Sequence, residues 1–368
     1  MPRSEEASRE IAAGLQRLAQ DAALFFSMPW LEGLSPRVLN DRERAEVHPS
    51  GEFPERRHGV FRVDEIGLPV FDHGALYGDS VFEGVLVTGG RLFTWKEHLA
   101  RMYSGAKSLE IDVPYNPVDL SLQIMRTVRE AGYDKEDLRY VRLVLTRGLG
   151  DLGIHPKKCL GGMVFAIVAK IQLYPEELYE RGIDLSIARE VRRPGGDVLN
   201  PRIKSSNYLN NIMALLEVQE GNPETLMLNQ RGYVAEATAD NLFLVTRTAG
   251  WEQDPSRVVV STPSAEYCLE GITRSLTLEA ARGLGYRCEE TPSMLPGDLV
   301  GPEREVFLTG TGAGLVPVIS VGGQTVGDAL PGPVTRNLRG KLLDAMADPG
   351  RGLSVEASRK DVESYLAP

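Results

Sequence analysis

The sequence predicts a protein of the α+β class, with mixed helices and strands in two halves that divide near residue 175. Three observations support this. The chain has 368 residues, more than the roughly 250–300 that one hydrophobic core usually serves. Its 42% hydrophobic and 25% charged residues are typical of a globular protein and not of a disordered one. Strand-like and helix-like segments occur in both halves, and no internal repeat is found.

The N-terminal region, residues 1–57, predicts a helical extension and a connector. Ile11, Leu15 and Leu18 recur at helical spacing, so residues 7–27 are expected to form one amphipathic helix. Glutamates at its start do not match a targeting peptide, and no stretch of about 18 apolar residues occurs in the chain. These observations favour a cytoplasmic protein without a membrane span. The connector is expected at 33–57, which is rich in Pro, Gly and charge.

The remaining elements follow from hydrophobic periodicity. In the first half, strands are expected within residues 59–72, 84–95, 138–146 and 163–171, and helices over 95–111 and 117–131. Residues 174–182 predict a linker or short turn. In the second half, strands are expected at 183–191, 226–229, 241–245, 257–263, 305–310 and 315–321, and helices at about 205–220 and 272–285.

The composition argues against several classes of function. The formal net charge is −10, whereas a general nucleic-acid-binding protein would need a basic surface. Cys159, Cys268 and Cys288 are far apart and odd in number, which suits a reducing compartment. The five histidines include no HExxH motif, so metal catalysis is not expected. The chain also lacks the GxSxG elbow of hydrolases and the GxxxxGK(S/T) phosphate loop.

Two charged side chains are candidates for chemistry. Lys204, in NPRIKSSNYLNN, lies where a polar loop enters a helix. A lysine that reacts with carbonyl groups needs partial burial to lower its pKa; the alternative is a surface lysine. Glu236, in GYVAEATADNLFLV, lies between a turn and an apolar strand. Its burial would require a cationic partner, and the protonated ring nitrogen of a pyridine cofactor is one; the alternative is an edge-strand glutamate facing water.

Two segments rich in glycine and threonine offer backbone N–H groups to anions. LEGITRS places Gly271, Ile272 and Thr273 at a helix start, where free N–H groups and the helix dipole attract negative charge. FLTGTGAGLVP (307–317) follows a strand and adds hydroxyl groups. Its GxGxG spacing and the strand-like segments after it do not match a dinucleotide-binding fingerprint. Ordinary turns are the alternative for both segments.

Two further arginines suit anionic groups. Arg101 lies on the helix that contains EHLARM, and its guanidinium suits a phosphate, with a solvated helix arginine as the alternative. Tyr140 and Arg142 are two residues apart in RYVRLVLTRG, so both are expected on one strand face. An arginine there would receive a substrate carboxylate or form an ion pair within the fold.

The order of these segments resembles a known family. DHGALYGDSVFEG (72–84), EHLARM, YVRLVLTRG, RIKSSNYLNN, GYVAEATADNLF, LEGITR and FLTGTGAG are similar to the motifs of class IV aminotransferases, the fold-type IV pyridoxal-phosphate enzymes. The resemblance runs over about residues 58–340 and is greatest to branched-chain amino acid aminotransferases. It implies a small N-terminal α/β domain at 58–174, a linker at 175–181, a large cofactor-binding domain with a β-barrel-like core at 182–345, and a C-terminal tail at 346–368.

The resemblance also implies a site for pyridoxal 5′-phosphate and no metal. Lys204 would form the aldimine with the cofactor and serve as the catalytic base. Glu236 would keep the ring nitrogen protonated, and Tyr208 would hydrogen-bond the ring's phenolic oxygen. The phosphate would be held by Arg101, Ile272, Thr273 and Thr311.

For the substrate, the resemblance implies an apolar side-chain pocket and two carboxylate sites. Tyr77 and Phe82 would line the apolar pocket. The α-carboxylate would meet Tyr140, Thr311 and Gly312, and Arg142 would receive the second carboxylate of glutamate or 2-oxoglutarate. The expected enzyme is a homodimeric transaminase that moves an amino group between leucine, isoleucine or valine and 2-oxoglutarate.

Two departures from the family pattern leave other substrates open. GTGAG replaces a GTAAE-type loop, and EATAD replaces the usual glycine-containing run after the glutamate. D-Amino acids, (R)-amines and an aminodeoxychorismate lyase activity are therefore alternatives within the family. A regulatory protein that binds the cofactor without catalysis is the alternative from another class.

Overall fold

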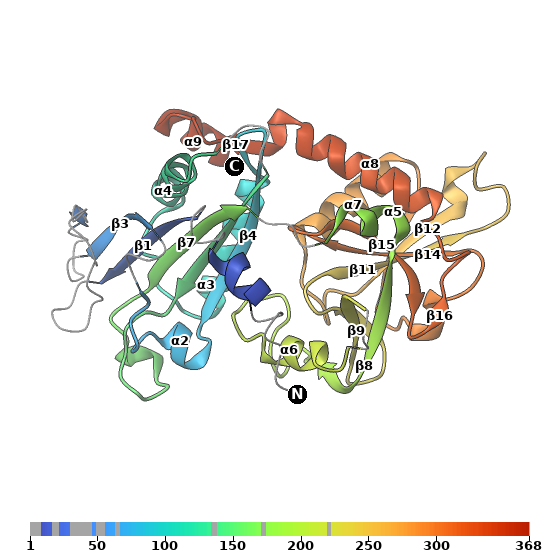
Figure 1. Ribbon diagram of the computed structural model, residues 1–368, viewed down its shortest axis with the longest axis horizontal. Helices are drawn as coiled ribbons and strands as arrows, with labels where there is room; N and C mark the ends of the chain where they lie inside the picture. Colours follow the sequence, from blue (N-terminus) through green and yellow to red (C-terminus); the bar gives the residue numbers. More distant parts are fainter. Residues whose placement is uncertain are drawn as a thin grey trace. The chain divides into compact units, whose positions relative to one another are not determined.

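The chain folds into two compact units. The structure is a computed structural model, and it describes residues 9–16, 22–29, 46–48, 56–62, 67–133, 138–170, 174–218 and 222–367. The first unit comprises Met1–Ile171 together with Pro349–Pro368, and the second comprises Gln172–Asp348 (Figure 1). The division thus lies just before the linker expected at 175–181. No helix in the described ranges is long and apolar enough to cross a membrane.

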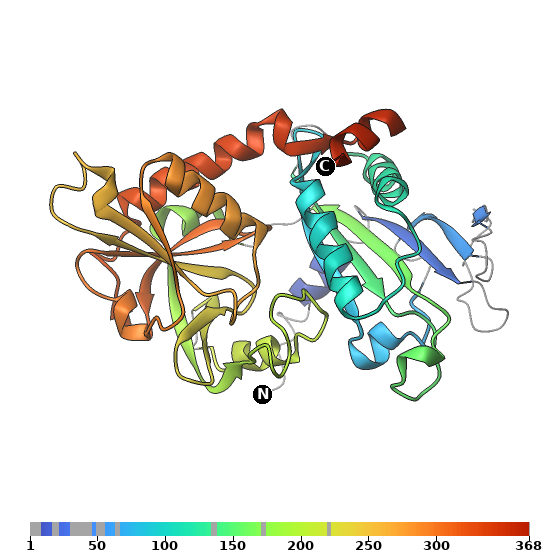
Figure 2. The same cartoon turned by 180° about the vertical axis from the view of Figure 1, so that it is seen from behind.

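An antiparallel sheet forms the centre of the first unit. Its strand order is β17-β5-β4-β6-β7-β1-β3-β2. The strands are β1 (Ala23–Pro29), β2 (Glu46–His48), β3 (Arg56–Arg62), β4 (Ser80–Thr88), β5 (Arg91–Phe93), β6 (Arg139–Thr146), β7 (Met163–Lys170) and β17 (Gly352–Ser354). The helices are α2 (His73–Tyr77), α3 (Trp95–Ser108), α4 (Pro117–Glu130) and α9 (Arg359–Leu366). Helix α3, the long teal helix in Figure 2, packs against β4.

The N-terminal segment departs from the single helix expected over 7–27. Residues 9–16 are helical, but Ala23–Pro29 form strand β1, which pairs with β3 on one side and β7 on the other. Phe25 and Phe26 are fully buried, and Phe26 packs against Phe61 and Met163. Aromatic residues favour strands, and this burial outweighs the local helical periodicity. Part of the expected extension is therefore an internal strand of the sheet.

The C-terminal segment also differs from the tail expected at 346–368. Gly352–Ser354 pair with β5 at the sheet's edge, and α9 packs against α4 (Figure 1). Ser358 caps α9 by accepting a hydrogen bond from the Asp361 backbone N–H, and the Asp361 side chain accepts one from the Ser358 N–H. This capping box starts a helix in a segment whose polarity alone suggested no structure.

The second unit is built on a curled sheet of mixed pairing. Its order is β10-β9-β8-β15-β14-β11-β12-β13, with β16 paired to β15. The strands are β8 (Ile183–Arg193), β9 (Glu224–Asn229), β10 (Val234–Ala237), β11 (Asn241–Arg247), β12 (Val258–Pro263), β13 (Arg287–Thr291), β14 (Arg304–Gly310), β15 (Gly314–Val321) and β16 (Gln324–Thr325). The helices are α5 (Glu176–Arg181), α6 (Leu209–Leu215), α7 (Ile272–Gly283) and α8 (Pro333–Ala347). Helix α5 occupies the expected linker, and α6 is shorter than the helix expected at 205–220.

The curl follows from the connection between β10 and β11. β10 lies at the edge of the strand order and β11 lies five places further along. In a flat sheet the two would be roughly 24 Å apart, but only residues 238–240 join them, which span about 15 Å at most. The sheet therefore bends back on itself, as the expected barrel-like core requires.

Both faces of the central strands in this unit are buried. Leu242, Leu244 and Leu308 belong to the apolar cluster on one face. Phe243 and Phe307 belong to the cluster that α7 and α8 cover on the other, and their rings stack with centroids 5.0 Å apart. This two-sided burial explains why NLFLV is a continuous apolar run without alternation. The loops and strand ends described next are fixed on this rigid core.

Candidate active site

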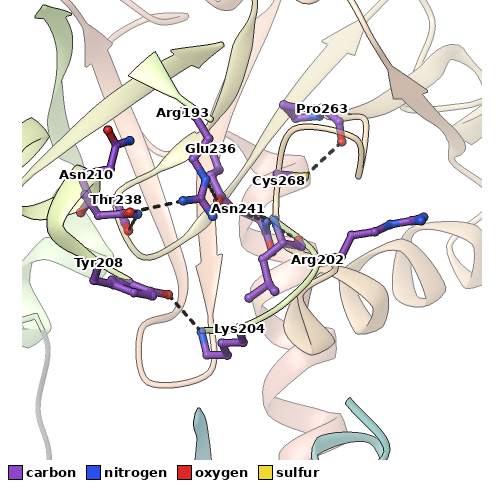
Figure 3. A network of polar contacts seen from close by, with 12 residues as sticks. Arg193, Arg202, Lys204, Tyr208, Asn210, Glu236, Thr238, Asn241, Pro263 and Cys268 are labelled. Carbon is purple, nitrogen blue, oxygen red and sulfur yellow. Dashed lines mark hydrogen bonds and ion pairs between the residues drawn. The ribbon is translucent and has the colours of Figure 1, made fainter. Parts of the chain in front are cut away.

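Lys204 lies in the loop between β8 and α6. It is half-buried, and its Nζ donates a long hydrogen bond of 3.5 Å to the Tyr208 hydroxyl (Figure 3). A small pocket surrounds it, lined by Arg193, Leu199, Asn200, Pro201, Ile203, Lys204, Ser205, Asn207, Tyr208 and Leu269. Lys204 is therefore not a fully solvated surface lysine, and its side chain lines a small pocket.

Glu236 is buried, with 5% of its surface exposed, although β10 is an edge strand. Its Oε1 lies 2.7 Å from Nε of Arg193, which comes from the end of β8. Its Oε2 accepts hydrogen bonds from the Leu269 backbone N–H at 3.0 Å and from Nδ2 of Asn241 at 3.1 Å. The buried carboxylate thus has a polar partner at both oxygens, so the alternative of a water-facing glutamate does not apply.

Arg193 is held in place from a second direction. Its Nη1 donates to Oδ1 of Asn211 on α6 at 3.3 Å. Asn211 in turn donates to the Thr238 carbonyl at 2.6 Å, just beyond β10. Figure 3 shows Arg193 and Glu236 side by side, with Lys204 and Tyr208 pointing toward one another. The loop of Lys204 and the strand of Glu236 are thus tied into one polar network.

The N-terminus of α7 follows the Leu269 contact. Gly271 is its N-cap residue, no side chain caps the helix, and the helix begins at Ile272, as expected from LEGITRS. A Cβ on Gly271 would lie 2.0 Å from Oδ1 of Asn241, so this position requires glycine. Asn241 also donates to the Leu269 carbonyl at 2.9 Å. It therefore connects Glu236 to a helix start that suits an anion.

The second N–H-rich segment is the turn of a β-hairpin. β14 and β15 pair up to Gly310 and Gly314, and residues 311–313 connect them. Gly314, the first residue after these three, has φ of +67°, a left-handed conformation that favours glycine. Thr311 and Gly312 are partly exposed at the tip, where their N–H groups and a hydroxyl can meet a ligand.

The substrate residues expected from the first unit gather on its sheet. β4 and β6 pair so that Gly84 lies opposite Arg142 and Leu86 opposite Tyr140. Cζ of Arg142 lies 4.4 Å from the centre of the Phe82 ring and 5.8 Å from that of Tyr140. Tyr140 and Arg142 thus share one strand face, as their spacing predicts. In the described ranges Arg142 forms no ion pair, so the alternative of an ion pair within the fold is not seen. Tyr77 ends α2, and its hydroxyl donates to the Leu152 carbonyl.

Arg101 is fixed by a buried carboxylate of the same unit. Its Nε and Nη2 donate to Oε1 and Oε2 of Glu83 at 2.8 and 2.7 Å, and Nδ1 of His98 lies 2.7 Å from Oε2. Burial tends to raise the pKa of Glu83, but the charge and hydrogen bonds of Arg101, with a smaller contribution from His98, lower it to about 2. The bidentate pair sets the direction of the guanidinium, so Arg101 is not a freely solvated helix arginine.

The structure thus arranges the expected residues in two groups, one in each unit. Sequence reasoning missed Arg193, Asn241 and Asp240 in the second group. Asn241 and Asp240 follow Glu236 in the ATADN run, so proximity to the candidate glutamate was an available signal. Arg193 is one of three arginines near the end of β8, and nothing in the sequence distinguishes it from the other two.

Comparisons with known proteins identify the family of this chain. The family model of class IV amino-transferases matches residues 80–321. A protein of Methanocaldococcus jannaschii, to which branched-chain-amino-acid aminotransferase activity is ascribed, is 39% identical over 280 residues, which cover 75% of this chain and 90% of that protein. The D-alanine aminotransferase of Bacillus licheniformis is 29% identical and covers 77% of this chain and 93% of its own.

Solved structures give the same result. The T.th. branched-chain amino acid aminotransferase, complexed with N-(5′-phosphopyridoxyl)-L-glutamate, has a TM-score of 0.69 and 29% identity, covering 83% of this chain and 94% of that one. The Thermoproteus uzoniensis enzyme, solved with norvaline, has a TM-score of 0.67 and 27% identity, covering 79% of this chain and 93% of that one.

This chain belongs to the class IV aminotransferases. It is a transaminase of the fold-type IV group that acts on amino acids and oxo acids, and its cofactor is pyridoxal phosphate. The residues of the second unit fit this cofactor: an amine beside a small pocket, a buried carboxylate paired with an arginine, and a helix start without a side-chain cap that suits a phosphate.

Proposed function

We propose that the enzyme moves an amino group between a branched-chain L-amino acid (leucine, isoleucine or valine) and 2-oxoglutarate. The observation that supports this choice of substrates is the packing of Arg142 against the Phe82 ring. One surface then offers both an aromatic ring and a guanidinium, which together accommodate an apolar side chain and a second carboxylate. The two substrates differ in this way, because leucine is apolar where glutamate carries its second carboxylate.

Within this proposal the second unit carries the chemistry. Lys204 would hold the cofactor through Nζ, and its amine, when free, would move the proton at the substrate's α-carbon. The cofactor supplies an electron sink for the bond that breaks. Glu236, paired with Arg193, would accept a hydrogen bond from the protonated ring nitrogen, and Tyr208 would contribute its hydroxyl beside Lys204.

The remaining residues bind the anionic groups. The phosphate is assigned to Arg101, Ile272, Thr273 and Thr311. The α-carboxylate is assigned to Tyr140, Thr311 and Gly312, and the second carboxylate to Arg142. Tyr77 and Phe82 provide the apolar wall. The uncapped start of α7 and the exposed tip of the β14–β15 hairpin support the first two assignments.

The assembly and location are part of the same proposal. Five apolar residues on and beside α6 are exposed in the single chain, which supports a homodimer that covers them: Leu209, Ile212, Met213, Leu215 and Leu216. Size-exclusion chromatography with light scattering tests the dimer. The three free cysteines suit the cytoplasm as the location.

A second candidate is a D-amino acid transaminase. The similarity to the D-alanine aminotransferase of B. licheniformis supports it, and both activities would use the same Lys204 chemistry. The two candidates differ in the hand of the amino acid that they accept.

Absorbance titration of the purified holoenzyme separates these candidates. L-Leucine should convert the visible band of the bound cofactor to the pyridoxamine form, and D-alanine should leave it unchanged. A response to D-alanine alone would replace the substrate assignment and keep the roles of Lys204 and Glu236. Lys204→Ala should lose the band typical of a covalently attached cofactor, and turnover near the wild-type rate in this variant would refute the mechanism.

A further inference from the structure

Asp240 is a buried carboxyl group without a role in the reaction described above. It lies in the turn that joins β10 to β11, and 6% of its surface is exposed. Its Oδ2 accepts a hydrogen bond of 3.5 Å from the Tyr174 hydroxyl. Its Oδ1 lies against Gly310, where a Cβ would be only 1.8 Å away. No cation forms an ion pair with Asp240 within the described ranges.

The surroundings of Asp240 favour its protonated form. Burial raises the pKa of its carboxyl group, and the negative charge of Glu224 raises it further. The charge of Lys204 and the hydrogen bond from the Tyr174 hydroxyl oppose these effects. Together they raise the pKa of Asp240 to about 7. Glu224 on β9 is itself buried and accepts hydrogen bonds from the hydroxyl and the backbone N–H of Thr238. Glu236 adds a smaller repulsion. Asp240 therefore changes charge near neutral pH.

Asp240 also contacts the base of the hairpin that is assigned to anions. Gly310 is the last residue of β14 and pairs with Gly314 across the turn. At the tip of the same hairpin, the Ala313 carbonyl accepts a hydrogen bond of 2.9 Å from the Tyr179 hydroxyl. The rings of Tyr174 and Tyr179 meet edge to face, 6.4 Å apart. One short segment around α5 thus braces both the carboxyl group and the hairpin.

We propose that Asp240 is a positioning residue that must carry a proton for the Gly310–Gly314 hairpin to bind an anionic group. When neutral, it supports the base of the hairpin without opposing the ligand. When ionised, it places a negative charge beside the hairpin and repels the anion. The anion is the substrate's α-carboxylate or the cofactor's phosphate, which share this chemistry. The inference rests on the proposed use of Thr311 and Gly312.

The first test compares wild type with Asp240→Asn, which has nearly the same shape and no charge at any pH. Binding of 4-methylvaleric acid to the holoenzyme is measured by calorimetry between about pH 6 and about pH 8.5, and cofactor retention is measured by dialysis over the same range. Wild-type affinity should fall about five- to tenfold with rising pH, and the variant should show no such fall. A loss in the first assay identifies the carboxylate, and a loss in the second identifies the phosphate.

Two further variants shift the transition in opposite directions. Tyr174→Phe removes a hydrogen bond to the ionised form, so the midpoint of the fall should move to higher pH. Glu224→Gln removes a negative neighbour, so the midpoint should move to lower pH. A merely structural role of Asp240 would not produce opposite shifts, and these variants also carry the test if Asp240→Asn does not fold.

The outcomes separate this inference from the proposed function. If wild type responds to L-leucine but its anion binding has the same pH dependence as Asp240→Asn, the inference is wrong and the transaminase assignment stands. Shifts of both further variants in one direction would also overturn it. If wild type does not respond to any amino acid, the proposed function itself fails.

Discussion

Glu236 and Asp240 show how partners determine the charge of a buried carboxyl group. The two residues are four positions apart and about equally buried. Glu236 has a guanidinium and two N–H donors, whereas Asp240 has one tyrosine hydroxyl and an acidic neighbour. One carboxyl group therefore has a cationic partner, whereas the pKa of the other is raised to about 7. Two acids whose environments differ in this way commonly have different roles in one site.

The ion pair between Arg193 and Glu236 leads to a prediction about a single residue. Arg193→Gln leaves the Glu236 carboxylate buried without its cation, so kcat/KM for L-leucine should fall about 10- to 100-fold. Arg202→Gln is the matched control, because Arg202 lies near Lys204 in the chain but forms only an exposed ion pair with Glu270. Steady-state kinetics and thermal unfolding check both variants. An equal loss in the two variants would contradict the role of Arg193.

Strand β1 shows the limits of prediction for individual elements. Most of the strands and helices follow from periodicity, as α3, α4 and β6 illustrate. LFF, however, is a continuous apolar run that periodicity cannot assign to a helix or a strand. Its partners β3 and β7 decide the outcome, and β7 begins well over a hundred residues later in the chain. Such long-range pairing is not encoded in a local pattern.

The buried side of β1 should be sensitive to truncation. Phe26→Ala removes a fully buried ring that packs against Phe61 and Met163, so the free energy of unfolding of the first unit should fall by about 3–5 kcal/mol. Ile11→Ala, in the described N-terminal helix, removes an exposed side chain and should change stability by less than about 0.5 kcal/mol. Urea unfolding followed by circular dichroism compares them. Similar midpoints for both would show that β1 adds little stability.

As with the helices and strands, part of the candidate site could be predicted from the local sequence and part could not. Lys204, Glu236 and the start of α7 could be found because each stands in a distinctive local setting. Arg193 could not be found from its local sequence, because the pairing of β8 with β9 shifts register between Ile187 and Arg192. That irregularity breaks the two-residue alternation, which would otherwise place Arg189 and Arg193 on one face of the strand and Arg192 on the other. The geometry of a strand irregularity depends on its neighbours and not on its own sequence.

At the scale of the whole molecule, the stabilities of the two units should change in opposite directions with pH. The pKa of Glu83 in the first unit is lowered to about 2, so its contribution to stability is present above about pH 4.5 and is lost as the pH falls toward 2. A shift of this size corresponds to on the order of 3 kcal/mol. The pKa of Asp240 in the second unit is raised to about 7, so its contribution is present below about pH 4 and is lost as the pH rises toward 7.

Hydrogen exchange with mass spectrometry follows each unit separately. Glu83→Gln should remove much of the first unit's loss of protection in acid, at the cost of lower stability at neutral pH. Asp240→Asn should reduce the decline of the second unit's protection between about pH 4 and about pH 7. If wild type shows the same pH trend in both units, the opposite charge states inferred for these acids are wrong.

The return of the C-terminal segment to the first unit has a consequence for biosynthesis. Strand β17 and helix α9 complete a sheet whose other strands are made before the second unit begins. During translation, the second unit can fold as soon as it leaves the ribosome, whereas the edge of β5 in the first unit stays unpaired until Gly352–Ser354 have been made. An unpaired edge is a site of misassociation. The nascent chain should therefore depend most on chaperones through its earliest part, although that part is synthesised first.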